Sequence, residues 1–108
     1  MIKKLFFIAL FLIFSQESIA QNSLEDKANE ITKEMARALS LSDAQKEKVF
    51  MIHYERFKEA NTIRENYGDE PQIKKAALKK VYNKLYGKLQ ATLGKELMNK
   101  WKDYKKNK

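Results

Sequence analysis

Apolar side chains recur every three or four residues along this chain from residue 24 to residue 104, with short interruptions near residues 40, 69 and 94. This spacing is that of an α-helix with one buried face, whereas a half-buried strand alternates every second residue. The 108 residues include only three glycines and one proline, so the turn residues that a fold of short strands needs are scarce. There is no cysteine, which excludes a disulfide framework and any cysteine-based metal or redox site. The sequence therefore predicts a single all-α domain.

The first twenty residues have the layout of a secretory signal peptide. Two lysines precede an unbroken apolar run over 5–14, and Ser18 and Ala20 place small residues before a cleavage point. The run is far shorter than the ~20 residues that a membrane-spanning helix requires. We expect three segments: a signal peptide over 1–20, a single helical domain over 21–104 and a basic tail over 105–108. The mature protein is then expected to be periplasmic or secreted.

Four helices are expected after the signal peptide, over about 23–39, 42–67, 71–92 and 95–104. Gly68 is expected to end the second helix in a left-handed conformation, and Pro71 to open the third in its first turn. Gly87, inside the third helix, is expected to allow a close helix contact or a local bend. The two long central helices should form an antiparallel hairpin, because the link between them is tight. A chain this short buries only about 60–65% of its unfolded surface, so dimerisation is expected to complete the core.

Each central helix carries a second apolar stripe beside the one that should form the core. The terminal helices or a second copy of the chain could cover these stripes. Alternatively, they remain exposed as an aromatic and methionine surface, rimmed by lysines, that binds apolar or unfolded segments. The candidate client or partner surface comprises Phe50, Tyr54 and Phe57 on the first stripe, Leu78, Tyr82 and Tyr86 on the second, and Met98, Trp101, Lys75 and Lys79.

The net charge of +8 is divided unevenly along the chain. Residues 21–70 contain eight basic and eleven acidic residues, whereas residues 71–108 contain twelve lysines and two acids. The lysines of the third helix can pair with Glu47, Glu55 and Glu59 across the hairpin, or they can attract an anionic partner such as lipid headgroups or acidic proteins. Nucleic acid is not expected as a partner, because an exported chain with few arginines lacks the guanidinium forks that recognise phosphate and bases.

The sequence contains no arrangement of side chains that carries catalysis or holds a metal. His53 is the only histidine, and the positions three and four residues away hold Val49, Phe50, Arg56 and Phe57, none of which is a good metal ligand. A serine or threonine nucleophile would need a nearby base. The sequence therefore predicts no enzyme activity, no cofactor and no metal site, with His53 as a partly buried helix residue.

A short motif at the start of the second helix carries a family resemblance. Leu41 is followed by Ser42 as a helix cap and by Gln45, which can reach back to the cap as in a capping box. This pattern resembles the L-T/S-x-x-Q motif of the Spy/CpxP-like LTxxQ family of bacterial periplasmic proteins. A second copy would run from Leu93 to Leu97, with glycine in place of Thr or Ser and leucine in place of Gln.

The resemblance implies a four-helix chain that dimerises as a thin curved cradle. It also implies ATP-independent chaperoning of unfolded envelope proteins, or inhibition of a stress-sensing kinase. We therefore expect a holdase-type chaperone or envelope-stress modulator that acts as a homodimer on unfolded or acidic envelope proteins. Two alternatives are a regulatory partner of one specific envelope protein and a protein that binds anionic membrane surfaces.

Overall fold

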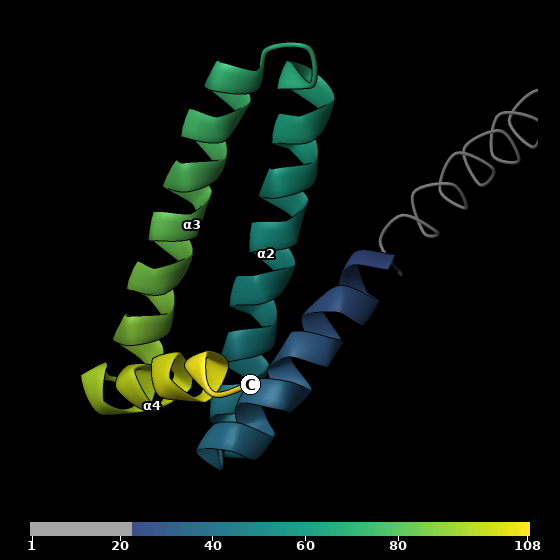
Figure 1. Cartoon of the computed structure of the whole chain (residues 1–108). Helices are drawn as coiled ribbons and strands as arrows, with labels where there is room; N and C mark the ends of the chain where they lie inside the picture. The colour runs from purple at the N-terminus through teal and green to yellow at the C-terminus, as the bar shows by residue number, and fades with distance from the viewer. Residues whose placement is uncertain (1–22) are drawn as a thin grey trace, which may run out of the picture.

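The computed structural model describes residues 23–108, which fold into helices joined by short breaks (Figure 1). The N-terminal helix is described over 23–39, and it is followed by α2 (Asp43–Tyr67), α3 (Pro71–Leu93) and α4 (Lys95–Lys106). No strand occurs among the described residues, which confirms the expected all-α fold. The expected signal peptide lies outside the residues that the structure describes.

The core lies at one end of a long hairpin. α2 and α3 run antiparallel, and the N-terminal helix and α4 both pack at the end opposite the turn (Figure 1). The largest fully buried side chains come from three of these helices: Met35 from the N-terminal helix, Val49 from α2 and Leu89 from α3. Between Ala60 on α2 and Val81 on α3 no residue is buried. The half of the hairpin near its turn is therefore only two helices thick.

The N-terminal helix ends in a Schellman motif that turns the chain into α2. Ser40 has a φ of 53°, the left-handed conformation that glycine usually takes at this position. The backbone N–H of Leu41 donates a hydrogen bond to the carbonyl oxygen of Ala36 at 3.2 Å. Leu41 is buried in the core cluster, as is usual for the apolar residue that follows this motif. The direction of entry into α2 is thus fixed by both a backbone turn and an apolar contact.

Ser42 and Gln45 form the capping box that the sequence predicts. The backbone N–H of Gln45 donates to Ser42 Oγ at 3.2 Å, and the backbone N–H of Ser42 donates to Gln45 Oε1 at 2.9 Å. Two backbone donors that the start of a helix leaves free are satisfied in this way. The predicted helix cap of Leu41, Ser42 and Gln45 is confirmed.

The expected left-handed conformation at Gly68 is wrong. Gly68 has a φ of −55° and a ψ of −34°, which is right-handed helical backbone. A Cβ atom at residue 68 would lie 2.9 Å from the carbonyl oxygen of Arg64, so glycine is required there for a close approach rather than for its φ. The glycine with positive φ is Gly94, at 89°, and its N–H donates to the carbonyl oxygen of Gln90 at 2.8 Å. The sharp change of direction between α3 and α4 depends on this residue.

Two further expectations concern α3. Pro71 occupies its first turn, as predicted. Of the two alternatives at Gly87, a close helix contact or a local bend, the close contact is wrong, because nothing lies within 4 Å of the position that a Cβ atom would take. Leu85 and Leu89, on the other side of the helix, make the packing contacts instead.

The molecule is elongated, with a radius of gyration of 17.7 Å and extents of 60 × 38 × 24 Å. A compact domain of similar length would have a radius of gyration of about 12–13 Å. Much of each central helix is therefore uncovered by the rest of the described chain. Among the described helices, none combines the length and the apolar composition needed to cross a bilayer.

The two serines at the junction of the N-terminal helix and α2 should respond in opposite directions to substitution. Ser42→Ala removes the cap oxygen and should lower the free energy of unfolding by about 1 kcal/mol. Ser40→Gly relieves the Cβ strain of a φ of 53° and should raise that free energy by about 0.5–1 kcal/mol. Urea denaturation followed by circular dichroism measures both, and effects of the same sign would contradict this account of the junction.

Candidate functional site

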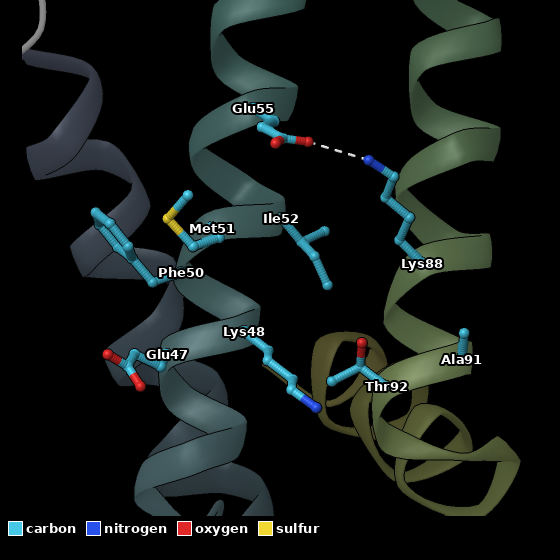
Figure 2. A pocket seen from close by; sticks show the side chains of 9 residues that line it. All are labelled: Glu47, Lys48, Phe50, Met51, Ile52, Glu55, Lys88, Ala91 and Thr92. Carbon is cyan, nitrogen blue, oxygen red and sulfur yellow. Dashed lines mark hydrogen bonds and ion pairs between the residues drawn. The ribbon is translucent and has the colours of Figure 1, made fainter.

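An open groove lies between α2 and α3 near the end of the hairpin that holds the core (Figure 2). Its volume is about 700 Å³ and its wall is mainly apolar. We call it the α2–α3 groove. Its lining residues are Glu47, Lys48, Phe50, Met51, Ile52 and Glu55 from α2 and Lys88, Ala91 and Thr92 from α3.

Three consecutive apolar residues of α2 give the groove its character. Ile52 points toward α3, whereas Phe50 points away from α3 toward the N-terminal helix (Figure 2). Both are half-buried, and Met51 between them has 52% of its surface exposed. Three neighbouring residues on a helix cover an arc of about 200°, which is wider than one core stripe. The middle side chain of this run is therefore left facing solvent.

Two ion pairs join α2 to α3 beside the groove. Lys88 Nζ lies 3.0 Å from Glu55 Oε2 (Figure 2), and Lys84 Nζ lies 3.0 Å from Glu59 Oε1. The hydrogen bond from Lys88 holds the pKa of Glu55 below its usual value, so this carboxylate stays ionised. The expected pairing across the hairpin is thus present for two of the three glutamates. Exposed pairs of this kind add little stability.

A second groove continues the first toward the N-terminal helix. Its volume is about 630 Å³, and it shares the side chains of Glu47 and Phe50 with the α2–α3 groove. We call it the N-terminal groove. Its lining residues are Asn29, Thr32, Lys33, Ala36, Arg37, Leu41, Asp43, Lys46, Glu47 and Phe50. Together the two grooves form a hollowed surface that crosses three helices and has Phe50 at its centre.

The first predicted aromatic stripe lies only partly in this surface. Phe50 lines both grooves and stacks on Tyr54, with ring centroids 6.0 Å apart. Tyr54 and Phe57 are half-buried and line neither groove, and the same holds for Leu78 of the second stripe. The stripe therefore supplies one groove residue, Phe50, and Tyr54 contacts its ring.

The expected exposure of Met98 and Trp101 is wrong. They are 2% and 3% exposed and belong to the core cluster. The reason is the change of direction at Gly94, which folds α4 back so that its apolar face packs on the hairpin end. The two residues stabilise the fold and are not available to a client.

The remaining predicted residues lie on α3. Lys75 and Lys79 are exposed, and neither forms an ion pair within the described part of the chain. Tyr82 and Tyr86 are in contact, with ring centroids 4.9 Å apart, but they line a different hollow from Phe50. The structure thus divides the predicted single surface between two sides of the hairpin.

The hollow that Tyr82 and Tyr86 line lies where the N-terminal helix, α2, α3 and α4 meet, and its volume is about 210 Å³. We call it the junction cavity. Its lining residues are Ile31, His53, Arg56, Tyr82, Leu85, Tyr86, Leu89, Trp101 and Lys105. The two charged residues among them are both basic.

His53 is buried rather than partly buried, with 2% of its surface exposed. Its Nε2 atom lies 3.3 Å from the sulfur of Met35, and its Nδ1 atom has no hydrogen-bond partner among the described residues. Burial, together with the positive charges of Arg56 and Lys105, lowers its pKa to about 4. The ring is therefore neutral at neutral pH. Within residues 23–108, no group of three or more His, Asp or Glu side chains is placed to hold a metal ion.

The sequence reasoning missed Met51 and the junction cavity. The signal for Met51 is the unbroken apolar run of four residues over 49–52, which is too wide for one stripe. The signal for the cavity is Arg56, a basic residue at a position that shares the apolar stripe of Val49 and Ile52. A charged residue at a core-facing position requires either a partner or an opening.

Comparison of the chain with protein-family models, with curated proteins and with solved structures found no match. The family resemblance therefore rests on the motif at residues 41–45 and on the helix cap that it forms.

Replacing His53 should remove part of the chain's sensitivity to acid. His53 titrates near 4 in the folded chain and near 6.5 in the unfolded chain, so the unfolded chain binds more protons between these pH values. The contribution of His53 to the free energy of unfolding should then fall by an amount on the order of 3 kcal/mol as the pH is lowered through this window. Above the window this contribution should be constant. His53→Gln should lack this loss. Arg56, Lys105 and the two tyrosines are the other titratable groups that line the same cavity, and both proteins contain them.

The test is urea denaturation of the wild type and His53→Gln at about pH 7 and about pH 4.5. The two proteins contain the same carboxylates, so the difference between their losses of stability reports on His53. If the wild type and His53→Gln lose the same stability between these two conditions, the buried ring is not neutral in the folded state.

Proposed function

We propose that this chain is an exported helical binding protein that acts as an ATP-independent, holdase-type chaperone or as a modulator of an envelope-stress response. It binds unfolded or apolar segments of client proteins in the α2–α3 groove and the N-terminal groove. The observation that carries the proposal is the open apolar groove with the exposed side chain of Met51 in its wall. A methionine side chain adapts to many partners, which suits clients of varied sequence.

The shape of the hollow also supports the proposal. A small-molecule site encloses most of its ligand, whereas these two grooves are open and meet end to end at Phe50. An open groove of this kind fits an extended chain segment. Its rim carries both signs of charge, with Glu47 and Glu55 near Lys48 and Lys88. Clients of either charge would find a weak counterpart there.

The family resemblance and the shape of the molecule support two further parts of the proposal. The motif at residues 41–45 forms a helix cap, and residues 23–108 form four helices, the number that a resemblance to the Spy/CpxP-like LTxxQ family implies. The half of the hairpin near its turn buries no residue between Ala60 and Val81. A second copy of the chain would cover part of that surface, so we propose a homodimer as the working state.

Met51→Glu should weaken holdase activity. A charge in the wall of the groove makes the binding of apolar segments less favourable. The matched control is Ile73→Glu, because Ile73 is also apolar and 49% exposed but lies outside both grooves. Ile73 lies in the half of the hairpin that a second copy is proposed to cover, so the two variants are compared only under conditions in which size-exclusion chromatography gives both the oligomeric state of the wild type. The assay is light scattering by a chemically unfolded client, without nucleotide. Several-fold more Met51→Glu than Ile73→Glu should be needed for the same suppression of aggregation.

Both variants should keep the helicity and melting temperature of the wild type, since both residues are exposed. The chaperone proposal is wrong if the wild type gives no suppression at several-fold excess over the client. The groove is the wrong site if the two variants lose activity equally.

A second candidate function is binding to an anionic membrane surface, and the exposed lysines of α3 favour it. Lys75 and Lys79 form no ion pair within the described residues, unlike Lys84 and Lys88. Unpaired surface lysines attract anionic headgroups, and this attraction is screened by salt. Acidic envelope proteins would be attracted by the same charges.

Co-sedimentation with vesicles tests this candidate. Vesicles that contain phosphatidylglycerol should bind the wild type more tightly than phosphatidylcholine vesicles do, and salt should weaken the binding. A Lys75→Gln, Lys79→Gln double variant should bind less, whereas a Lys84→Gln, Lys88→Gln double variant should lose less, because those lysines are already paired with glutamates. If vesicle binding does not depend on lipid charge or on salt concentration, the proposed membrane function is wrong.

A further inference from the structure

The junction cavity holds more hydrogen-bond donors than acceptors. The Oη atom of Tyr86 accepts a hydrogen bond from Tyr82 Oη at 3.1 Å and another from the ammonium group of Lys105. The bond between the tyrosines uses only one of the two phenolic hydrogens, so the other has no acceptor among the described residues. The Nε atom of Arg56 is buried and also has no partner there. The cavity therefore offers N–H and O–H groups to an acceptor that this part of the chain does not supply.

The charges of the cavity are also unbalanced. Arg56 and Lys105 are both basic, no carboxylate lines the cavity, and neither residue forms an ion pair within residues 23–108. The guanidinium carbon of Arg56 lies 4.2 Å from the ring centroid of Phe57, a contact that provides no hydrogen-bond acceptor. A charge that is partly removed from water is normally paired with an opposite charge. A negative charge is therefore the missing component.

Apart from the buried His53, the rest of the wall is apolar. Leu85, Leu89 and Trp101 form part of it, and all three belong to the core cluster. The volume of about 210 Å³ is below the usual range for a drug-sized ligand, so a small molecule fits. Tyr82 and Lys105 are exposed, which places the polar groups where the cavity opens to solvent.

We propose that the junction cavity binds a small organic monocarboxylate that carries an apolar or aromatic group. The carboxylate accepts hydrogen bonds from Arg56, Lys105 and the free phenolic hydrogen, and the apolar group lies against Leu85, Leu89 and Trp101. This site is separate from the two grooves and does not depend on the proposed chaperone function.

The wall favours a carboxylate of this type over inorganic phosphate or sulfate. A fully charged oxyanion would place charge against the leucine and tryptophan side chains, where it would lose its hydration without gaining a partner. His53 is neutral at neutral pH, because burial lowers its pKa, so it does not add a third positive charge that would favour a dianion. A monoanion with an apolar group can pair its charge with the basic side chains and pack its apolar group against the apolar ones.

Binding of phenylacetate, with phenylacetamide as the neutral control, tests the proposal. Trp101 is the only tryptophan of the chain and it lines the cavity, so its fluorescence reports on occupancy. Phenylacetate should change this fluorescence in a saturable way. Phenylacetamide should bind at least about tenfold more weakly, because it lacks the charge that Arg56 and Lys105 recognise.

Variants assign the binding to the cavity. Arg56→Gln and Lys105→Gln should each weaken phenylacetate binding by about tenfold or more. Lys106→Gln is the matched control, because Lys106 is exposed on the same helix and does not line the cavity. Lys105 is exposed, so its variant keeps the test decisive if Arg56→Gln does not fold. Met51→Glu should bind phenylacetate like the wild type, which separates this site from the groove.

Three results would overturn the proposal. The first is no saturable response to phenylacetate in the millimolar range. The second is equal binding of phenylacetate and phenylacetamide. The third is unchanged binding by the folded variants of Arg56 and Lys105.

Discussion

The packing of four helices at one end of the hairpin is the contact on which the rest of this structure depends. Met35, Val49 and Leu89 are fully buried there, and Met98 and Trp101 close the cluster from α4. Two antiparallel helices alone cannot bury a core of this kind, because each presents only one stripe to the other. The N-terminal helix and α4 supply the missing cover, and they do so only where they cross the hairpin. Both candidate sites lie at or beside this cluster.

The two terminal helices are brought to this cluster by their links to the hairpin. The left-handed Ser40 and the capping box of Ser42 and Gln45 turn the N-terminal helix into α2. Gly94, with a φ of 89°, turns α3 into α4. These residues are distant in sequence, but both links lie at the same end of the hairpin (Figure 1). The cavity between the four helices therefore depends on backbone conformation at a few positions as well as on apolar packing.

The helices could be predicted from the sequence because they depend on local periodicity and on caps within a few residues of each other. The pairing of Glu55 and Glu59 with lysines followed from charge spacing once the hairpin was assumed. The burial of Trp101 could not be predicted, because it depends on the direction that α4 takes after Gly94. Glycine occurs at both interhelical breaks of the hairpin region, and composition does not tell which of them has positive φ. Of the candidate site, Phe50 was predicted, whereas Met51 was not, since a periodic stripe selects side chains that share a face.

Two turns of α2, residues 50–56, contribute to both sites. Phe50 and Met51 line the α2–α3 groove, whereas His53 and Arg56 line the junction cavity, and no side chain lines both. The sites are thus back to back on one helix, so a ligand in one cannot touch a ligand in the other. Any influence between them must pass through the packing of α2 on α3, where Ile52 points toward α3 (Figure 2). An anion bound to Arg56 would neutralise a charge on the side of α2 that faces the junction cavity. A client bound at Met51 would contact the side of α2 that faces the groove. Because the two ligands make no direct contact, any coupling between the sites depends on whether this packing changes when one of them is occupied.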